Sequence, residues 1–125
     1  MYLPMFSWHV FKANLLDLGL VSQEQLDAMK KECYTMRKED PIGRRRSNNG
    51  AGWQSVDGVN DRPMFQSLLN GVEEVFKKEV FPFHCGEHHE NFILDHGNYW
   101  VNINYQHGYN NCLLYTSPSP RDLST

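Results

Sequence analysis

The sequence predicts an α+β fold, with two helices followed by strands near its end. Apolar residues recur at helical spacing in residues 22–39 and again in residues 63–76, whereas residues 99–105 alternate between faces as a β-strand does. The chain has 125 residues, of which 40% are hydrophobic and 13% aromatic. We therefore expect one globular domain with a modest core.

Composition argues against several classes of protein. The net charge of −3 does not suit a strongly basic, non-specific nucleic-acid binder. Three cysteines, Cys33, Cys85 and Cys112, stand at irregular spacings and indicate neither a disulfide framework nor a paired zinc motif. The N-terminal stretch has no basic start and carries His9 and Lys12 within its apolar run, unlike a signal peptide or a membrane span. We expect a cytoplasmic protein that does not enter the membrane and does not bind nucleic acid.

The first elements are expected to be a strand and a helix. Residues 6–11 alternate, with Phe6, Trp8 and Val10 on one face, and this pattern predicts a short strand with a buried side. Ser22, with Gln25 three residues later, predicts a helix N-cap. The buried stripe of that helix comprises Leu26, Met29, Cys33 and Met36. It should end before Pro41.

A loop and a second helix follow. Residues 41–55 combine Gly, Asn, Ser and a run of three arginines without an apolar period, which predicts a loop. Asp61 and Pro63 mark the start of the second helix, and Phe81 and Pro82 should close it. Its predicted buried residues are Phe65, Leu68, Leu69, Val72, Val75 and Phe76.

Two strand-like runs, residues 92–94 and 99–105, come last. In the second run, Asn102 and Asn104 share a face with Trp100, and the apolar residues take the other face. Such alternation fits a sheet with a solvated outer face. It fits equally a barrel interior in which amides bind a polar ligand, and the alternation does not separate the two.

A resemblance bears on that choice. The chain contains Gly-Trp-Gln-Ser at residues 52–55, a helix rich in Phe and Leu, and Tyr-Trp-Val-Asn-Ile-Asn-Tyr-Gln-His-Gly-Tyr-Asn-Asn at residues 99–111. In this combination it resembles the 2-oxoglutarate- and Fe(II)-dependent oxygenases of marine phages and bacteria. The resemblance covers most of residues 1–111, and the last motif is its specific part. It implies two helices packed on an incomplete antiparallel double-stranded β-helix, a jelly-roll or cupin-like fold, and hydroxylation of an unactivated C–H bond.

The resemblance also implies a site. Enzymes of this kind hold Fe(II) with two histidines and a carboxylate, which leaves positions for 2-oxoglutarate and dioxygen. The family pattern places the first ligand at position 113, where this chain has Leu113. Asn102 and Asn104 match the positions that contact the 2-oxoglutarate carboxylates in related dealkylases, although the second is a Tyr in those dealkylases. The resemblance thus implies cosubstrate contacts at Asn102 and Asn104 and no metal ligand in this chain.

The C-terminal tail resembles something other than a protein. Every residue from Cys112 to Asp122 agrees with a translation of the transposase adapter used in short-read sequencing. The adapter would also supply the last base of the Asn111 codon. An ordinary Ser/Pro-rich tail is the alternative. We expect residues 1–111 to be the N-terminal part of an oxygenase-like domain and residues 112–125 to be an adapter-derived artefact, so that the chain as written is inactive and poorly stable.

Other polar groups have simpler interpretations. Residues 84–90 are rich in His, Cys and Glu, but their spacing matches no closed zinc site and predicts a solvated loop. His107 is expected to be an exposed loop histidine. Arg44, Arg45 and Arg46 could meet an anion, but they are expected to form a solvated charge run. Trp53 and Gln54 are expected to anchor their loop.

Two functional hypotheses follow. The first is a fragment of an oxygenase whose intact parent binds Fe(II) and 2-oxoglutarate as a small-molecule cosubstrate. The second is a non-enzymatic phage or bacterial accessory protein that keeps the jelly-roll architecture for binding or assembly. The identity of the substrate is open under either hypothesis.

Overall fold

The computed structural model describes residues 1, 8–45 and 48–110 and has the mixed helix and strand content of an α+β protein. The chain divides into two compact units, each built from two segments. We call Met1–Gln23 with Ser67–Asp95 the helical unit, and Glu24–Gln66 with His96–Thr125 the mixed unit. The tail at 112–125 and position 113 lie outside the described residues. Among the described residues, no helix has the length and apolar character that crossing a membrane requires.

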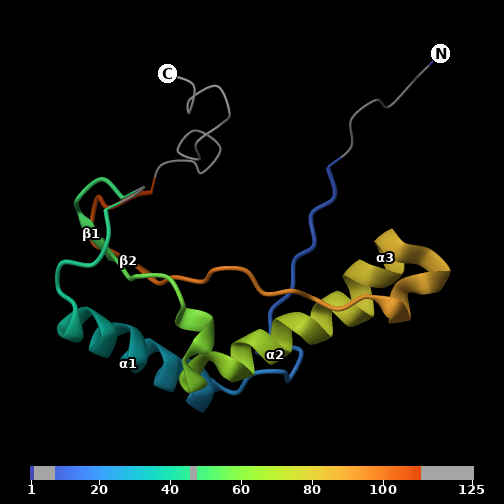
Figure 1. Cartoon of the computed structure of the whole chain (residues 1–125), viewed down its shortest axis with the longest axis horizontal. Coiled ribbons are helices and arrows are strands. Elements are labelled where there is room, and N and C mark those ends of the chain that lie inside the picture. The colour runs from blue at the N-terminus through green and yellow to red at the C-terminus, as the bar shows by residue number, and fades with distance from the viewer. Residues whose placement is uncertain (2–7, 46–47, 111–125) are drawn as a thin grey trace. The chain divides into compact units, whose positions relative to one another are not determined.

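The mixed unit contains the helix expected after Ser22. Helix α1 spans Gln23–Glu39 and begins directly after Ser22 (Figure 1). Met29 and Met36, both on the predicted apolar stripe, are buried. The helix ends one residue before Asp40, as the following Pro41 requires. The predicted helix and its end are confirmed, whereas Leu26 and Cys33 on the predicted stripe are only half-buried.

The sheet of the mixed unit consists of two short antiparallel strands, β1 (Gly52–Gln54) and β2 (Asn102–Asn104), labelled in Figure 1. Trp53 lies opposite Ile103. Hydrogen bonds extend the ladder at both ends, from Ser55 N to Val101 O at 2.9 Å and from Tyr105 N to Ala51 O at 3.0 Å. The predicted strand at 99–105 is therefore regular only at its centre, and the prediction of loop throughout 41–55 is wrong for β1.

Trp53 ties β1 to the end of α1. Its side chain is only 4% exposed, and its Nε1 donates to the Asp40 carbonyl oxygen at 2.8 Å. The turn between them passes through Gly43, whose φ is +58°. A Cβ on Gly43 would collide with the Gln54 carbonyl oxygen and the Trp53 indole, so only glycine fits there. The anchoring role predicted for Trp53 is confirmed.

Two 3₁₀ turns, η1 (Val59–Asp61) and η2 (Pro63–Phe65), lead from the strand to helix α2 (Gln66–Val75). The predicted start near Asp61 and Pro63 is thus helical, but the α-helix proper begins later. Of the predicted buried residues, Phe65 and Leu69 are buried. Leu68, Val72, Val75 and Phe76 are half-buried.

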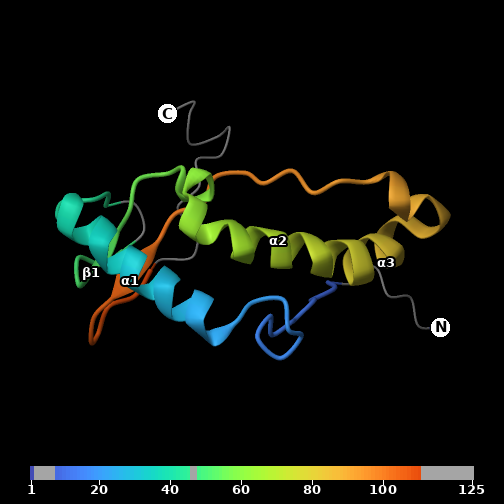
Figure 2. The same ribbon diagram turned by 90° about the horizontal axis from the view of Figure 1, so that it is seen from below.

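The helical unit continues past the predicted stop. After α2, a π-helical turn, η3 (Phe76–Val80), leads into α3 (Phe81–Cys85), and Figure 2 shows these as one continued helical run. Pro82 stands in the first turn of α3, where its missing N–H is not needed. In the wider π turn, the Phe81 N–H donates to the Phe76 carbonyl. This turn lies between Pro82 and the α-helical hydrogen bonds of α2. The prediction that Phe81 and Pro82 end the helix is therefore wrong.

Neither of the two outer strand predictions is met in the described residues. Trp8 and Val10 are 92% and 88% exposed and do not form a strand, and the remainder of the 6–11 pattern includes residues that the structure does not describe. Residues 92–94 are also outside any strand, and Ile93 is 84% exposed. Alternation produces a strand only where a neighbouring strand pairs its backbone groups, and the described residues provide none for these segments.

Replacing Trp53 tests the anchor of the mixed unit. Trp53→Phe keeps an aromatic ring but leaves the Asp40 carbonyl without its donor, so we expect the free energy of unfolding to fall by about 1–3 kcal/mol. Urea denaturation followed by far-ultraviolet circular dichroism measures this. Trp8→Phe is the matched control, because Trp8 is exposed and its replacement should leave stability unchanged. If the two variants were equally stable, the hydrogen bond from Trp53 to Asp40 would not anchor β1 to α1.

Candidate functional site on the paired strands

The site predicted from the sequence lies on one face of β2. Asn102 and Asn104 are both exposed and point to the same side, whereas Ile103 between them is half-buried. Across the ladder, Gln54 lies opposite Asn102 and Gly52 lies opposite Asn104. Opposed residues share a face, so Gln54 belongs to the same amide-bearing face, which we call the amide face.

Asn110 joins the two predicted residues. Asn104 Nδ2 donates to Asn110 Oδ1 at 2.9 Å, and Asn110 Nδ2 donates to Asn102 Oδ1 at 3.3 Å. The network leaves the Nδ2 group of Asn102 without a partner among the described residues. Three amides thus form one chain of hydrogen bonds on an exposed surface. The sequence signal for Asn110 was its place in the Gly-Tyr-Asn turn, but its link to the strand residues was not predicted.

Asn49 holds the turn that carries Asn110. Its backbone N–H donates to the Tyr109 carbonyl at 3.1 Å, and its side-chain Nδ2 donates to the His107 carbonyl at 3.0 Å. Its Oδ1 accepts from the N–H groups of Ala51 and Tyr109, each at 3.2 Å. Sequence analysis missed this residue, whose only signal was the Asn-Asn-Gly turn composition at residues 48–50.

The turn at residues 105–108 approaches the β1 segment closely. Gly108 N donates to the Tyr105 carbonyl at 2.8 Å and closes the turn. A Cβ on Gly108 would collide with the Ala51 carbonyl oxygen, so the position requires glycine for close approach. His107 is exposed, as predicted, and has a φ of +64°, which is uncommon for a residue with a side chain.

Gln54 is the least satisfied polar residue of the amide face. Its side chain is only 2% exposed, and its Oε1 has no hydrogen-bond partner among the described residues. A buried acceptor without a donor is costly, typically about 1–3 kcal/mol. Its position therefore marks a place where the protein would gain stability from a donor.

The arginine run is partly structural. Arg44 NH1 pairs with Asp57 Oδ2 at 2.9 Å, with 37% and 24% of the two side chains exposed. The expectation of a solvated charge run is therefore wrong for Arg44, because Asp57 holds it against the mixed unit. Arg45 is exposed, as expected, and Arg46 lies outside the described residues.

Metal and nucleophile chemistry find little support in the described part of the chain. No group of three or more His, Cys, Asp or Glu side chains lies close enough there to hold a metal ion. Residues 84–90 form the end of α3 and the 3₁₀ turns of η4 (Gly86–Asn91), so the predicted loop is helical. Burial raises the pKa of the Cys33 thiol, which disfavours the reactive thiolate.

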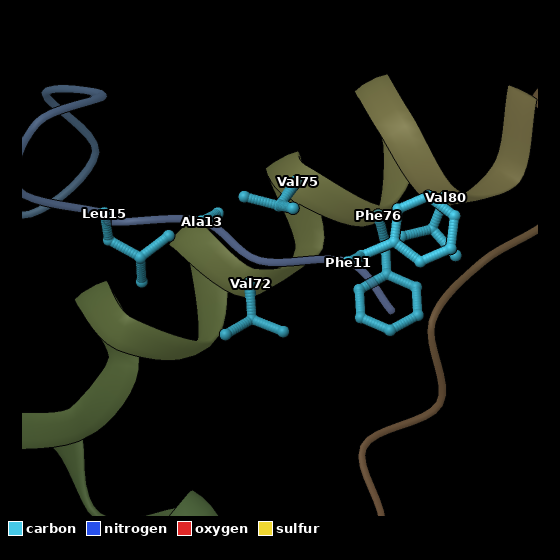
Figure 3. A pocket seen from close by; sticks show the side chains of 7 residues that line it. All are labelled: Phe11, Ala13, Leu15, Val72, Val75, Phe76 and Val80. Carbon is cyan, nitrogen blue, oxygen red and sulfur yellow. The ribbon is translucent and has the colours of Figure 1, made fainter. Parts of the chain in front are cut away.

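The helical unit has an apolar cavity of about 410 Å³, shown in Figure 3. Its seven lining residues come from the N-terminal segment and from the run of α2 and η3: Phe11, Ala13, Leu15, Val72, Val75, Phe76 and Val80. None of these side chains can donate or accept a hydrogen bond. The cavity therefore has no side-chain group that could orient a polar substrate or carry out chemistry.

Comparisons with family models, with curated proteins and with solved structures find no match to this chain. A proposal for the function therefore rests on the residues of the site alone.

The close approach at Gly108 gives a direct test of the turn. Gly108→Ala places a methyl group against the Ala51 carbonyl, so we expect a loss of about 1–3 kcal/mol in the free energy of unfolding. Gly97→Ala is the control, since a Cβ there meets nothing within 4 Å. Urea denaturation of both variants gives the comparison. A Gly108→Ala protein as stable as Gly97→Ala would show that the turn does not pack as described.

Proposed function

We propose that residues 1–111 are the N-terminal part of a 2-oxoglutarate- and Fe(II)-dependent oxygenase, and that the amide face contacts the carboxylates of 2-oxoglutarate. The observation that carries the proposal is the joint placement of Asn102 and Asn104 on one exposed strand face, with Asn110 bridging them. These residues come from the Trp-x-Asn-Ile-Asn and Gly-Tyr-Asn parts of the motif that resembles this family.

The amide face suits a carboxylate ligand. An asparagine Nδ2 offers two N–H donors, and a carboxylate accepts such bonds strongly. The Nδ2 of Asn102 has no partner among the described residues. Asn104 donates one of its two Nδ2 hydrogens to Asn110. Both residues therefore retain donors for the oxygens of a bound cosubstrate.

The described residues do not fit Fe(II). A facial site needs two histidines and a carboxylate within bonding distance of one point, and no such group of three is present there. In the proposal, the iron ligands and the remaining strands of a double-stranded β-helix belong to the intact parent, beyond residue 111. The proposal assigns the amide face to cosubstrate binding alone.

The unmet acceptor of Gln54 needs a donor that a carboxylate does not supply. Gln54 lies across from Asn102 on the same face, is buried, and lacks a donor. An additional strand or bound group from the parent could supply one. The alternative hypothesis, a non-enzymatic accessory protein, gains no specific support from the described residues.

Sequencing the parent gene across the Asn111 codon, from DNA free of adapters, tests the first part of the proposal. We expect a histidine near position 113, followed by an acidic residue or histidine two positions later and by a distal histidine. A natural gene that encodes the present residues 112–125 and then stops would overturn the oxygenase assignment and favour the accessory protein.

Variants of the intact parent test the role of the amide face. Asn102→Ala and Asn104→Ala should each raise the KM for 2-oxoglutarate by about tenfold, the loss expected when a hydrogen bond to a charged group is removed. Asn98→Ala serves as the control, since Asn98 is exposed and precedes the strand. Succinate release under varied 2-oxoglutarate gives KM and kcat separately. Unchanged KM in both variants would remove Asn102 and Asn104 from the cosubstrate site.

A further inference from the structure

A second site lies in the mixed unit, on the side of the ladder away from the amide face. A cleft of about 400 Å³ is lined by Pro41, Ile42, Arg44, Arg45, Gly52, Trp53 and Tyr105. Strand alternation places Trp53 and Tyr105 on the face opposite Asn102 and Asn104. The cleft is therefore separate from the proposed cosubstrate contacts, and ligand binding there does not depend on the proposed function.

Every polar side chain of this cleft carries a donor group, and only the Tyr105 hydroxyl can also accept. Arg44 and Arg45 carry guanidinium groups, Trp53 an indole N–H and Tyr105 a hydroxyl, and no carboxylate or amide side chain is among the lining residues. The indole N–H is already used by the Asp40 carbonyl, so Arg44, Arg45 and Tyr105 remain. The one side-chain acceptor, the Tyr105 hydroxyl oxygen, is already bonded to Arg37, so the cleft selects a ligand rich in acceptors.

Two of these donors are fixed in place. Asp57 holds Arg44 NH1 at 2.9 Å and leaves the rest of that guanidinium free to bind elsewhere. Arg37 NH1 donates to the Tyr105 hydroxyl oxygen at 2.8 Å, and its guanidinium carbon lies 5.6 Å from the centre of the Tyr105 ring. Because the hydroxyl accepts from Arg37, its own hydrogen is available to another acceptor.

The electrostatic balance also favours an anion. Arg44 and Arg45 line the cleft, and Arg37 contacts the Tyr105 hydroxyl that also lines it. Of the nearby carboxylates, Asp57 offsets the charge of Arg44, and Asp40 accepts a hydrogen bond from the backbone N–H of Gly43 at 3.2 Å. Arg45 is exposed and brings a cation that no described carboxylate pairs. An incoming oxyanion would therefore meet the guanidinium of Arg45, which has no carboxylate partner among the described residues.

The remaining walls are apolar. Pro41, Ile42 and the Tyr105 ring present hydrocarbon surface, and Ile42 is 84% exposed, as is expected of a wall that lacks its partner. The volume falls within the lower range of small-molecule sites, about 300–1,000 Å³. The ligand should accordingly combine an anionic group with a small apolar or aromatic body.

We propose that this cleft binds a small organic oxyanion, a carboxylate or phosphate ester on an apolar or aromatic body. Arg45 and the Tyr105 hydroxyl donate to its oxygens, and Pro41 and Ile42 cover its body. Arg44, held by Asp57, supplies its remaining N–H donors.

Titration of the full chain with three probes tests the proposal. Benzoate and phenyl phosphate carry the anion on a ring, and benzyl alcohol keeps the ring without the charge. We follow the backbone amides of Gly43 and Gly52 and the Trp53 indole N–H in nitrogen-15 correlation spectra. We expect saturable shifts of these signals with the two anions and none with benzyl alcohol. The stronger of the two anions identifies the carboxylate or the phosphate ester as the preferred group.

Arg45→Gln should weaken binding of the preferred anion about tenfold, because it removes a charge-assisted hydrogen bond. Because the Arg45 side chain is exposed, this substitution should leave the stability of the fold unchanged. Lys30→Gln removes the same charge from an exposed position on α1 and should leave binding unchanged. Tyr105→Phe, which keeps the ring, should weaken binding severalfold through loss of the hydroxyl.

Three results would overturn the proposal. The first is equal binding of benzyl alcohol, which would indicate a merely apolar surface. The second is equal weakening in Arg45→Gln and Lys30→Gln, which would indicate general charge attraction. The third is absence of saturation up to about 10 mM of either anion, an affinity too weak for a formed site.

Discussion

The pairing of β1 with β2 is the constraint on which the mixed unit depends. Each strand has three residues, and an isolated pair of this length is not stable in water. Three further sets of contacts compensate. Trp53 fixes β1 to the end of α1, the ladder continues through Ser55 and Tyr105, and Asn49 ties the segment before β1 to the turn after β2. The strand pair is thus the centre of a wider set of contacts.

The same pairing separates two chemistries. Because side chains alternate along a strand, one face carries Asn102 and Asn104, and the other carries Trp53 and Tyr105. The first face has amides that both donate and accept, joined through Asn110. The second faces a cleft whose polar side chains offer donors, because the Tyr105 hydroxyl oxygen already accepts from Arg37. A shift of one residue in the register would exchange the two faces, so the contacts that fix the register also fix both candidate sites.

Local sequence patterns predicted what local forces determine. Helix α1 follows from an N-cap signal, an apolar stripe and a proline stop, all within a few turns. Strand β1 could not be predicted in the same way, since Gly-Trp-Gln pairs only with residues far along the chain. Asn102 and Asn104 were predictable as neighbours because alternation and motif both act along one short segment. The arginine-lined cleft was not, since Tyr105, which lines it together with Arg44 and Arg45, lies far along the chain from them. The sequence gives the charge of an arginine side chain. It does not give the partner residue that decides whether the guanidinium is solvated or fixed in an ion pair.

Gln54 sets a further condition on the amide face. Its Oε1 is buried there and lacks a donor among the described residues, while the Asn102 opposite keeps unused N–H groups at the surface. A ligand with acceptors alone would satisfy Asn102 and leave Gln54 as it is. Whatever completes the amide face must therefore bring both acceptors for Asn102 and a donor for Gln54. A carboxylate cosubstrate meets the first requirement only, so the donor has to come from a protein group or an ordered water beside it.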